Sequence, residues 1–256
     1  MHEKEAFDLN TYIMHHVLNS NEWHLPFLPP IPLPSFITLH GLMVIIWTVA
    51  MLWIFGFVYQ KNARYPTGIT NALEAIIIFI RNDISIEFLG KEDGKRMAPL
   101  FCTFFFFILG LNLMGLIPIF STATSNINVT GALALVTFCF MVFGAIYKNG
   151  IVGFFKAFIP PGVPKPILIL LFPIEFVGIF IKTGALMIRL FANMLAGHIV
   201  ILAMLGLVVI LGIGALPAVL LAIGVYALEV MVVFLQAFVF TLLSAIFIGQ
   251  MYHPQH

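Results

Sequence analysis

The chain has 256 residues, of which 61% are hydrophobic and only 9% carry a charged side chain. Soluble domains are about 45–50% apolar and about 25% charged. This composition, with a mean hydropathy of +1.08, therefore excludes a soluble domain and predicts a polytopic membrane protein. The net charge of +1 gives no reason to expect a nucleic-acid partner, and the segment GKEDGKR at 90–96 lacks the residue order of a phosphate-binding loop.

The chain reads as a single all-α membrane domain that begins with a polar, Pro-rich segment, 1–35. That segment lacks the basic start and short apolar core of a removable signal peptide. Three apolar stretches, 36–59, 97–120 and 129–147, are long enough to cross a hydrocarbon core as helices, which takes about 20 residues. Residues 67–89 mix apolar and charged side chains, which predicts an amphipathic helix on the membrane surface.

Residues 167–251 hold two longer apolar stretches, with turn residues near 212–217. At ~1.5 Å of rise per residue they exceed the thickness of a bilayer, which predicts a hairpin of two long, tilted helices. Residues at one level of an antiparallel hairpin have position numbers with a constant sum. For three pairs of polar residues, the sums of the position numbers agree to within two. The rule therefore predicts that the members of each pair lie at the same level: Arg189 with Gln236, His198 with Glu229, and Glu175 with Gln250.

The basic residues predict the orientation of the chain in the membrane. They gather before the second span and after the third: Lys61, Arg64, Arg81, Lys91, Lys95 and Arg96, then Lys148, Lys156 and Lys165. Cytoplasmic loops carry an excess of Lys and Arg. We therefore expect the N-terminus outside, the loop 121–128 outside, and the C-terminus in the cytoplasm.

Arg189 lies in an apolar run whose only other charges, Glu175 and Lys182, precede it at intervals of seven residues. Seven residues are about two helical turns, so the three charges share one face. An arginine at the bilayer centre costs at least about 2.5 kcal/mol and marks a functional site by default. One reading is a structural ion pair with Glu229 or Glu175. The other is a fixed positive charge that faces an acid on another subunit.

A stripe of small residues, Gly178, Ala185 and Ala192, lies on nearly the same face as these charges. Small residues allow the backbone of another helix to come close. This stripe favours a closely packed partner helix at the charged face.

His198 and Glu229 are predicted to be neighbours across the hairpin, and a histidine near an acid can pass a proton near neutral pH. Glu175, on the other side of Arg189, is either an interfacial anchor or part of a second polar route. Other polar residues either line these routes or form interhelical hydrogen bonds: Asn193, Gln236, Asn112 and Tyr226. Lys182 reads as a side chain that reaches the membrane surface.

The motif RLFANMLAGH from Arg189 to His198, with Glu229, LQAFVF at 235–240 and LNLMGLIP at 111–118, resembles subunit a of the F-type ATP synthase. By this resemblance, Arg189 is the stator arginine that faces the ion-carrying carboxylate of a c-subunit ring. Further residues fall where that family places two half-channels: Glu175, Asn193, His198, Glu229 and Gln236. Asn112 joins the outer route.

The resemblance also implies a bacterial inner-membrane protein with no catalytic site, cofactor or metal of its own. Its implied partners are the c-ring, the peripheral-stalk b subunits, membrane lipid and, indirectly, the soluble ATPase head. Two alternatives share the buried charges: a secondary transporter whose arginine binds an anionic substrate, and a proton-conducting subunit of a respiratory complex. The chain shows neither the internal repeat nor the short, broken helices of many secondary transporters.

Overall fold

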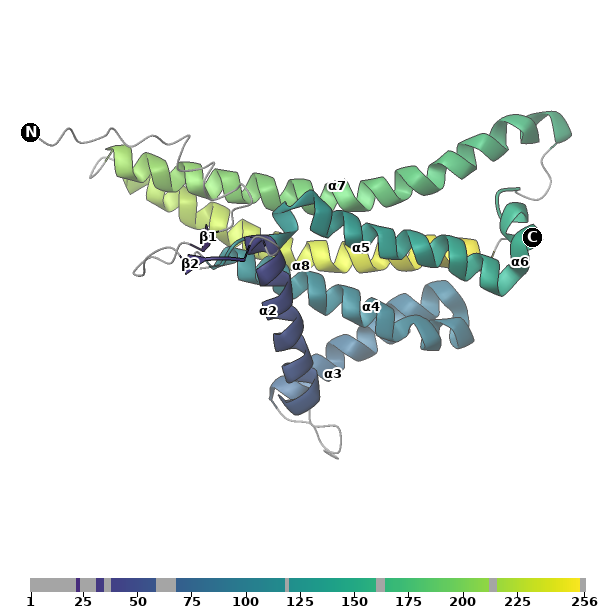
Figure 1. The fold of residues 1–256 in the computed structure, drawn as a ribbon, viewed down its shortest axis with the longest axis horizontal. Helices are drawn as coiled ribbons and strands as arrows, with labels where there is room; N and C mark the ends of the chain where they lie inside the picture. Colours follow the sequence, from purple (N-terminus) through teal and green to yellow (C-terminus); the bar gives the residue numbers. More distant parts are fainter. Residues whose placement is uncertain are drawn as a thin grey trace, which may run out of the picture.

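The computed structural model describes residues 22–23, 31–34, 38–58, 68–117, 120–159, 164–211 and 216–253. These residues form an elongated helical bundle (Figure 1). Five helical segments in the described part of the chain are long and apolar enough to cross a membrane. The predicted all-α, polytopic membrane fold is therefore confirmed, with one small addition: a two-stranded antiparallel pair, β1 (Glu22–Trp23) and β2 (Ile31–Pro32).

Helix α2 (Leu39–Trp53) begins at Thr38, whose hydroxyl accepts a hydrogen bond from the Gly41 amide at 3.3 Å. Such a cap satisfies one of the unpaired N–H groups of the first turn. The helix continues through the π-helical turn η1 (Ile54–Val58) and crosses the long axis of the bundle (Figure 1). The Trp47 indole donates to the Phe106 carbonyl at 3.2 Å. This hydrogen bond holds α2 against the helix at 87–116, which contains Phe106.

Helix α3 (Ile69–Phe79) and the π-helical stretch η2 (Ile80–Ile86) correspond to the expected amphipathic helix at 67–89. Helix α4 (Glu87–Leu116) follows directly, with a kink at Gly90, whose φ of 77° and ψ of 174° are not helical and reverse the chain. The hydroxyl of Ser85 donates to the Gly94 carbonyl at 2.6 Å across this reversal. The amphipathic segment thus packs against α4, and its placement on the membrane surface stays a prediction.

The next segment is a short 3₁₀ turn, η3 (Ala123–Ser125), followed by α5 (Ile127–Cys139), η4 (Phe140–Gly144) and α6 (Ala145–Lys156). Asn126 caps α5 by accepting from the Asn128 amide at 2.9 Å. Helical structure therefore starts earlier and ends later than the predicted span 129–147. A kink at Gly150, with φ 71°, divides α6.

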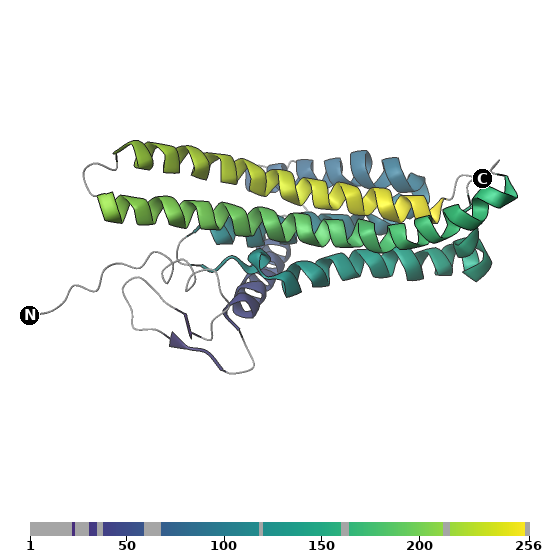
Figure 2. The same ribbon diagram turned by 90° about the horizontal axis from the view of Figure 1, so that it is seen from above.

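Helices α7 (Lys165–Leu211) and α8 (Leu216–Tyr252) are the two long helices of the predicted hairpin. They run antiparallel and side by side (Figure 2), and α7 bends away from α8 toward its N-terminal end (Figure 1). Of the predicted turn at 212–217, residues 212–215 lie outside the described residues.

The larger core cluster is rich in phenylalanine and contains buried side chains from η2, α4, η4, α6, α7 and α8. Phe104 and Phe240, for example, meet edge to face with ring centroids 5.6 Å apart. At one end of the bundle, Lys148 forms an ion pair with Asp93, and His253 lies 2.8 Å from the Leu89 carbonyl. These contacts tie the start of α4, α6 and the end of α8 together, and so hold the long helices in place around the polar residues.

Candidate functional site

Arg189 lies on the exposed face of α7. Leu186, Leu190 and Met194 of the same helix are buried, so the arginine points away from the core of this chain. Within the described residues, its side chain takes part in no hydrogen bond or ion pair. The structural ion pair with Glu229 or Glu175, one of the two readings of the sequence, is not formed there.

Small side chains flank Arg189 on this face. Ala185 and Ala192 are exposed, and Gly178 is half-buried. A Cβ added at Gly178 would meet nothing within 4 Å. The face around the arginine is thus open to the close approach of another helix.

Asn193, one turn after Arg189, donates its side-chain N–H to Gln236 Oε1 across the hairpin at 2.8 Å. Gln236 is 1% exposed, and its own Nε2 has no hydrogen-bond partner among the described residues. The interhelical hydrogen bond, one of the readings left open for these residues, is therefore present. The predicted partner of Gln236 was Arg189, so this pair was misplaced by one helical turn.

Glu229 of α8 is only 4% exposed, and neither carboxylate oxygen has a hydrogen-bond partner among the described residues. Its carboxylate lies against Gly197, where an added Cβ would lie 2.6 Å from Oε1. Gly197 precedes His198 in the chain, so the predicted level of Glu229 is correct to one residue. Direct contact between the side chains of His198 and Glu229 stays a prediction.

The loop that the sequence placed outside the membrane contributes directly to this cluster. Thr122 Oγ1 lies 3.3 Å from His198 Nδ1, and Thr124 donates to Asn112 Oδ1 at 2.6 Å. Thr122, Thr124 and Asn112 are all buried. Sequence reasoning missed both threonines, because the polar loop 121–128 has no periodicity that points to partners on other helices.

Asn112 and Tyr226 complete this group of polar residues, which we call the outer cluster: Asn112, Thr122, Thr124, His198, Tyr226 and Glu229. The Nδ2 of Asn112 has no hydrogen-bond partner among the described residues. The Tyr226 hydroxyl donates to the Leu116 carbonyl at 3.2 Å. The cluster joins α4, η3, α7 and α8, and its buried Asn112 Nδ2 and Glu229 oxygens, which lack partners among the described residues, are groups that water can satisfy.

On the other side of Arg189, Lys182 donates to Gln250 Oε1 at 3.1 Å and lies over the ring of Phe247. The predicted partner of Gln250 was Glu175, so this pair was also wrong. The residue of α7 that contacts Gln250 is Lys182, seven residues after Glu175. Glu175 itself is half-buried and forms no hydrogen bond or ion pair within the described residues.

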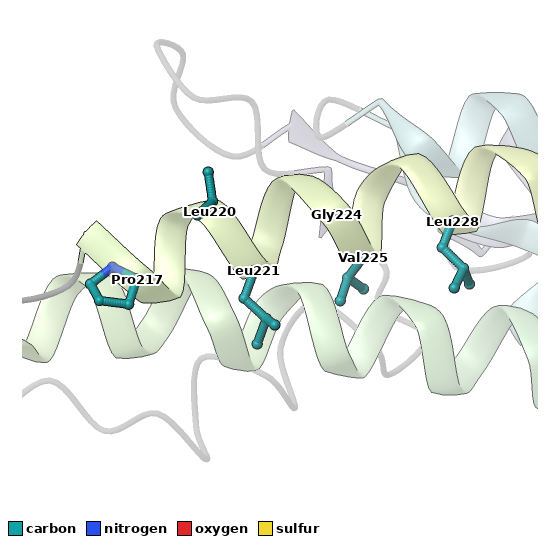
Figure 3. Close-up of a pocket in the computed structure, with 6 residues that line it drawn as sticks. All are labelled: Pro217, Leu220, Leu221, Gly224, Val225 and Leu228. Atoms are coloured by element: carbon teal, nitrogen blue, oxygen red, sulfur yellow. The ribbon is translucent and has the colours of Figure 1, made fainter.

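An open surface pocket of about 390 Å³ near the start of α8 is separate from these polar groups (Figure 3). It is lined by Pro217, Leu220, Leu221, Gly224, Val225 and Leu228. None of these side chains can accept or donate a proton. In the described part of the chain, no group of three or more His, Cys, Asp or Glu side chains is arranged to hold a metal ion.

Comparisons with known proteins identify the family of the chain. The family model described as ATP synthase A chain matches residues 41–249. ATP synthase subunit a of Anaeromyxobacter dehalogenans (strain 2CP-1 / ATCC BAA-258) is 47% identical over 198 residues, which are 74% of this chain and 50% of the relative. The subunit a of Chloroherpeton thalassium is 41% identical over all of this chain and 80% of its own length.

The chain spans about half the length of the Anaeromyxobacter relatives that it matches, and 72% of the Myxococcus xanthus subunit a, to which it is 42% identical. The region that the family model matches, 41–249, contains α4, α5 and most of the α7–α8 hairpin. It therefore includes every residue of the outer cluster as well as Arg189. On these grounds, the chain belongs to the ATP synthase subunit a family.

Proposed function

We propose that this chain is the stator subunit that conducts protons to and from a rotating c-subunit ring in the membrane sector of an ATP synthase. The observation that carries this proposal is the position of Arg189. Its charge lies on an exposed face of α7 with no partner among the described residues. A charge that lipid cannot solvate needs an acid from elsewhere, and the carboxylate of a c subunit supplies one.

Two polar routes reach this face from opposite directions. The outer cluster around His198 and Glu229 lies on the C-terminal side of Arg189 along α7, and Glu175 lies on its N-terminal side. Glu175 and His198 are 23 residues apart, more than 30 Å at ~1.5 Å of rise per residue. This separation favours two offset half-channels over one water-filled pocket.

In the proposed mechanism, a proton from outside passes through the outer cluster and neutralises a carboxylate of the ring. The neutral group can then rotate into lipid without the cost of an exposed charge. After nearly a full turn it reaches the Glu175 route. There the positive charge of Arg189 favours the ionised carboxylate, and the proton leaves toward the cytoplasm.

Arg189 also prevents a direct leak between the routes, because a proton moving past it would approach a fixed positive charge at low dielectric. Asn193 and Gln236 hold the two helices together beside the arginine. The membrane potential contributes ~2.3 kcal/mol per proton per 100 mV. Several protons must therefore pass for each ATP made by the soluble head.

The same proposal includes the orientation and partners of the chain. The basic residues that precede the apolar part of α4 and those that follow α5 favour a cytoplasmic position for these ends. The N-terminus is then outside and the C-terminus inside a bacterial plasma membrane. The b subunits of the peripheral stalk hold the chain still against the ring and link it to the ATPase head.

A photocrosslinking amino acid at position 192, in the assembled complex, tests the partner at this face. Ala192 is exposed beside Arg189, and Leu186 on the opposite face of α7 is buried. We expect position 192 to capture a small hairpin subunit with a membrane carboxylate, identified by mass spectrometry, and position 186 to capture none. Capture of only lipid at 192, in a complex that retains ATPase activity, would contradict the proposal.

A further inference from the structure

The short turn η3 connects three membrane helices through three nearby polar side chains. Thr122 contacts His198 of α7 at 3.3 Å, and Thr124 donates to Asn112 of α4 at 2.6 Å. Asn126 reaches in a third direction, and its Nδ2 lies 3.4 Å from Nδ1 of His40 in the first turn of α2. One turn therefore joins two histidines from helices that are far apart in the sequence.

The hydrogen bonds of Asn126 fix the protonation pattern of His40. Asn126 Oδ1 already accepts from the Asn128 amide at 2.9 Å, so the group that faces the ring is the NH₂, which can only donate. His40 Nδ1 must then accept this hydrogen bond. The ring is neutral in this state, with its proton on Nε2, and His40 is ready to bind a second proton when the hydrogen bond to Asn126 breaks.

The described residues around His40 are mostly apolar. It is 2% exposed and lies at the start of α2, next to an apolar cluster of Met43, Leu111, Met114 and Ala123. The charged residues of α4 are confined to 87–96, at the other end of that helix, and α5 and η3 carry none. Among the described residues, the titratable groups on the elements around it are His198, on the far side of η3, and Glu22 of β1, the strand whose Trp23 packs against the same cluster.

We propose that His40 is a further proton-binding group of the outer route, and that η3 passes protons between it and His198. The hydroxyls of Thr122 and Thr124 both donate and accept hydrogen bonds, Asn126 holds His40 beside this row by donating to its ring, and bridging water can complete the chain. A packing role alone would be met by an apolar side chain in this cluster. The first membrane helix then takes part in proton uptake as well as in anchoring. This inference rests on the proposed function.

The test uses the complete ATP synthase in reconstituted vesicles, with the pH of the outer-side compartment varied and the cytoplasmic-side pH held constant. His40→Gln keeps an oxygen that can accept from Asn126 but removes the titrating ring. We expect near-normal ATP synthesis at acid outer pH and a loss of roughly tenfold at neutral outer pH, less than the ~10²–10⁴ of a group at the reaction centre. Imidazole in the outer-side compartment should restore the rate. Met43→Leu, a buried apolar change three residues away, should leave the profile unchanged.

Two further variants keep the test decisive. Asn126→Ser retains a capping hydroxyl but cannot span to His40, so it should give the same change in outer pH profile even if the His40 variant fails to assemble. A profile identical to that of the unmodified complex in either variant, or a uniform loss that imidazole does not restore, overturns the inference. Arg189→Gln in the same vesicles reports separately on the proposed function, because normal transport in that variant would refute it whatever His40 does.

Discussion

The carboxylate of Glu229 packs against the backbone of Gly197, at a point where an added Cβ would lie 2.6 Å from Oε1. This contact joins the end of the RLFANMLAGH segment to the acid of the opposite helix. The buried carboxylate can occupy this place because position 197 has no side chain. The outer cluster therefore depends on a glycine as much as on its polar groups.

Gly197→Ala should displace Glu229 by about an ångström and reduce proton transport by up to ~10²-fold, the cost of misplacing a reacting group by that distance. Adding Glu229→Asp, which is shorter by one methylene, should recover part of the rate. ATP-driven acidification of inverted vesicles measures both. Gly224→Ala is the matched control, since a Cβ there meets nothing within 4 Å. Equal rates for the variants at 197 and 224 would show that the contact is unimportant.

The hairpin register predicts a specific pattern of crosslinks. Cysteine pairs at 193 with 236 and at 182 with 250 replace partners in hydrogen bonds of 2.8 and 3.1 Å. They should crosslink with a short bifunctional reagent. The pairs 189 with 236 and 175 with 250 are offset by one and two turns, about 6 and 10 Å of rise, and should crosslink poorly. The opposite ranking would restore the register predicted from the sequence.

The sequence predicted the long hairpin and the level of Glu229, but it misplaced the partners of Gln236 and Gln250. The reason is geometric. Residues four apart lie on the same helix face, so Arg189 and Asn193 are both compatible with Gln236 to within one turn. Side-chain length and helix bending decide between them, and α7 bends away from α8 toward its N-terminal end.

Thr122 and Thr124 were beyond the reach of sequence patterns for a different reason. They lie in and beside a short turn with no periodicity, and their partners, His198 and Asn112, belong to other helices. Only the packing of η3 between those helices brings the groups together. The family motifs identified the residues on the helices, and the three-dimensional arrangement added the turn that connects them.

The packing of α2 predicts a stability effect. An added Cβ at Gly110 of α4 would overlap the indole ring of Trp47, whose N–H bonds to Phe106. Gly110→Ala should therefore destabilise the chain by ~1–3 kcal/mol, as overpacking does, and lower the thermal unfolding midpoint in detergent. Trp47→Phe should partly relieve the clash in the double variant. Gly56→Ala, which meets nothing, should leave the midpoint unchanged, and a similar loss in both single variants would refute this account.

The two routes should respond to pH on different faces of the membrane. Glu229→Gln removes a titrating group from the outer cluster, so the rate should lose part of its dependence on outer pH. Glu175→Ala should slow transport while leaving that dependence as it was, and should change the response to cytoplasmic pH. Transport in a reconstituted membrane with the two pH values set independently measures this. The same response of both variants to both faces would leave a single shared route.

The exposed position of Arg189 is tested most directly by ATP-driven proton pumping in inverted membrane vesicles that carry Arg189→Gln. Because the guanidinium has no partner among the described residues, the substitution should leave assembly and the membrane-bound ATPase head intact. Pumping should be abolished, and Arg189→Lys should restore it poorly, because lysine is a more strongly hydrated charge that can lose its proton when buried. Normal pumping by the assembled Arg189→Gln complex would contradict the role of this residue as the fixed charge between the two routes.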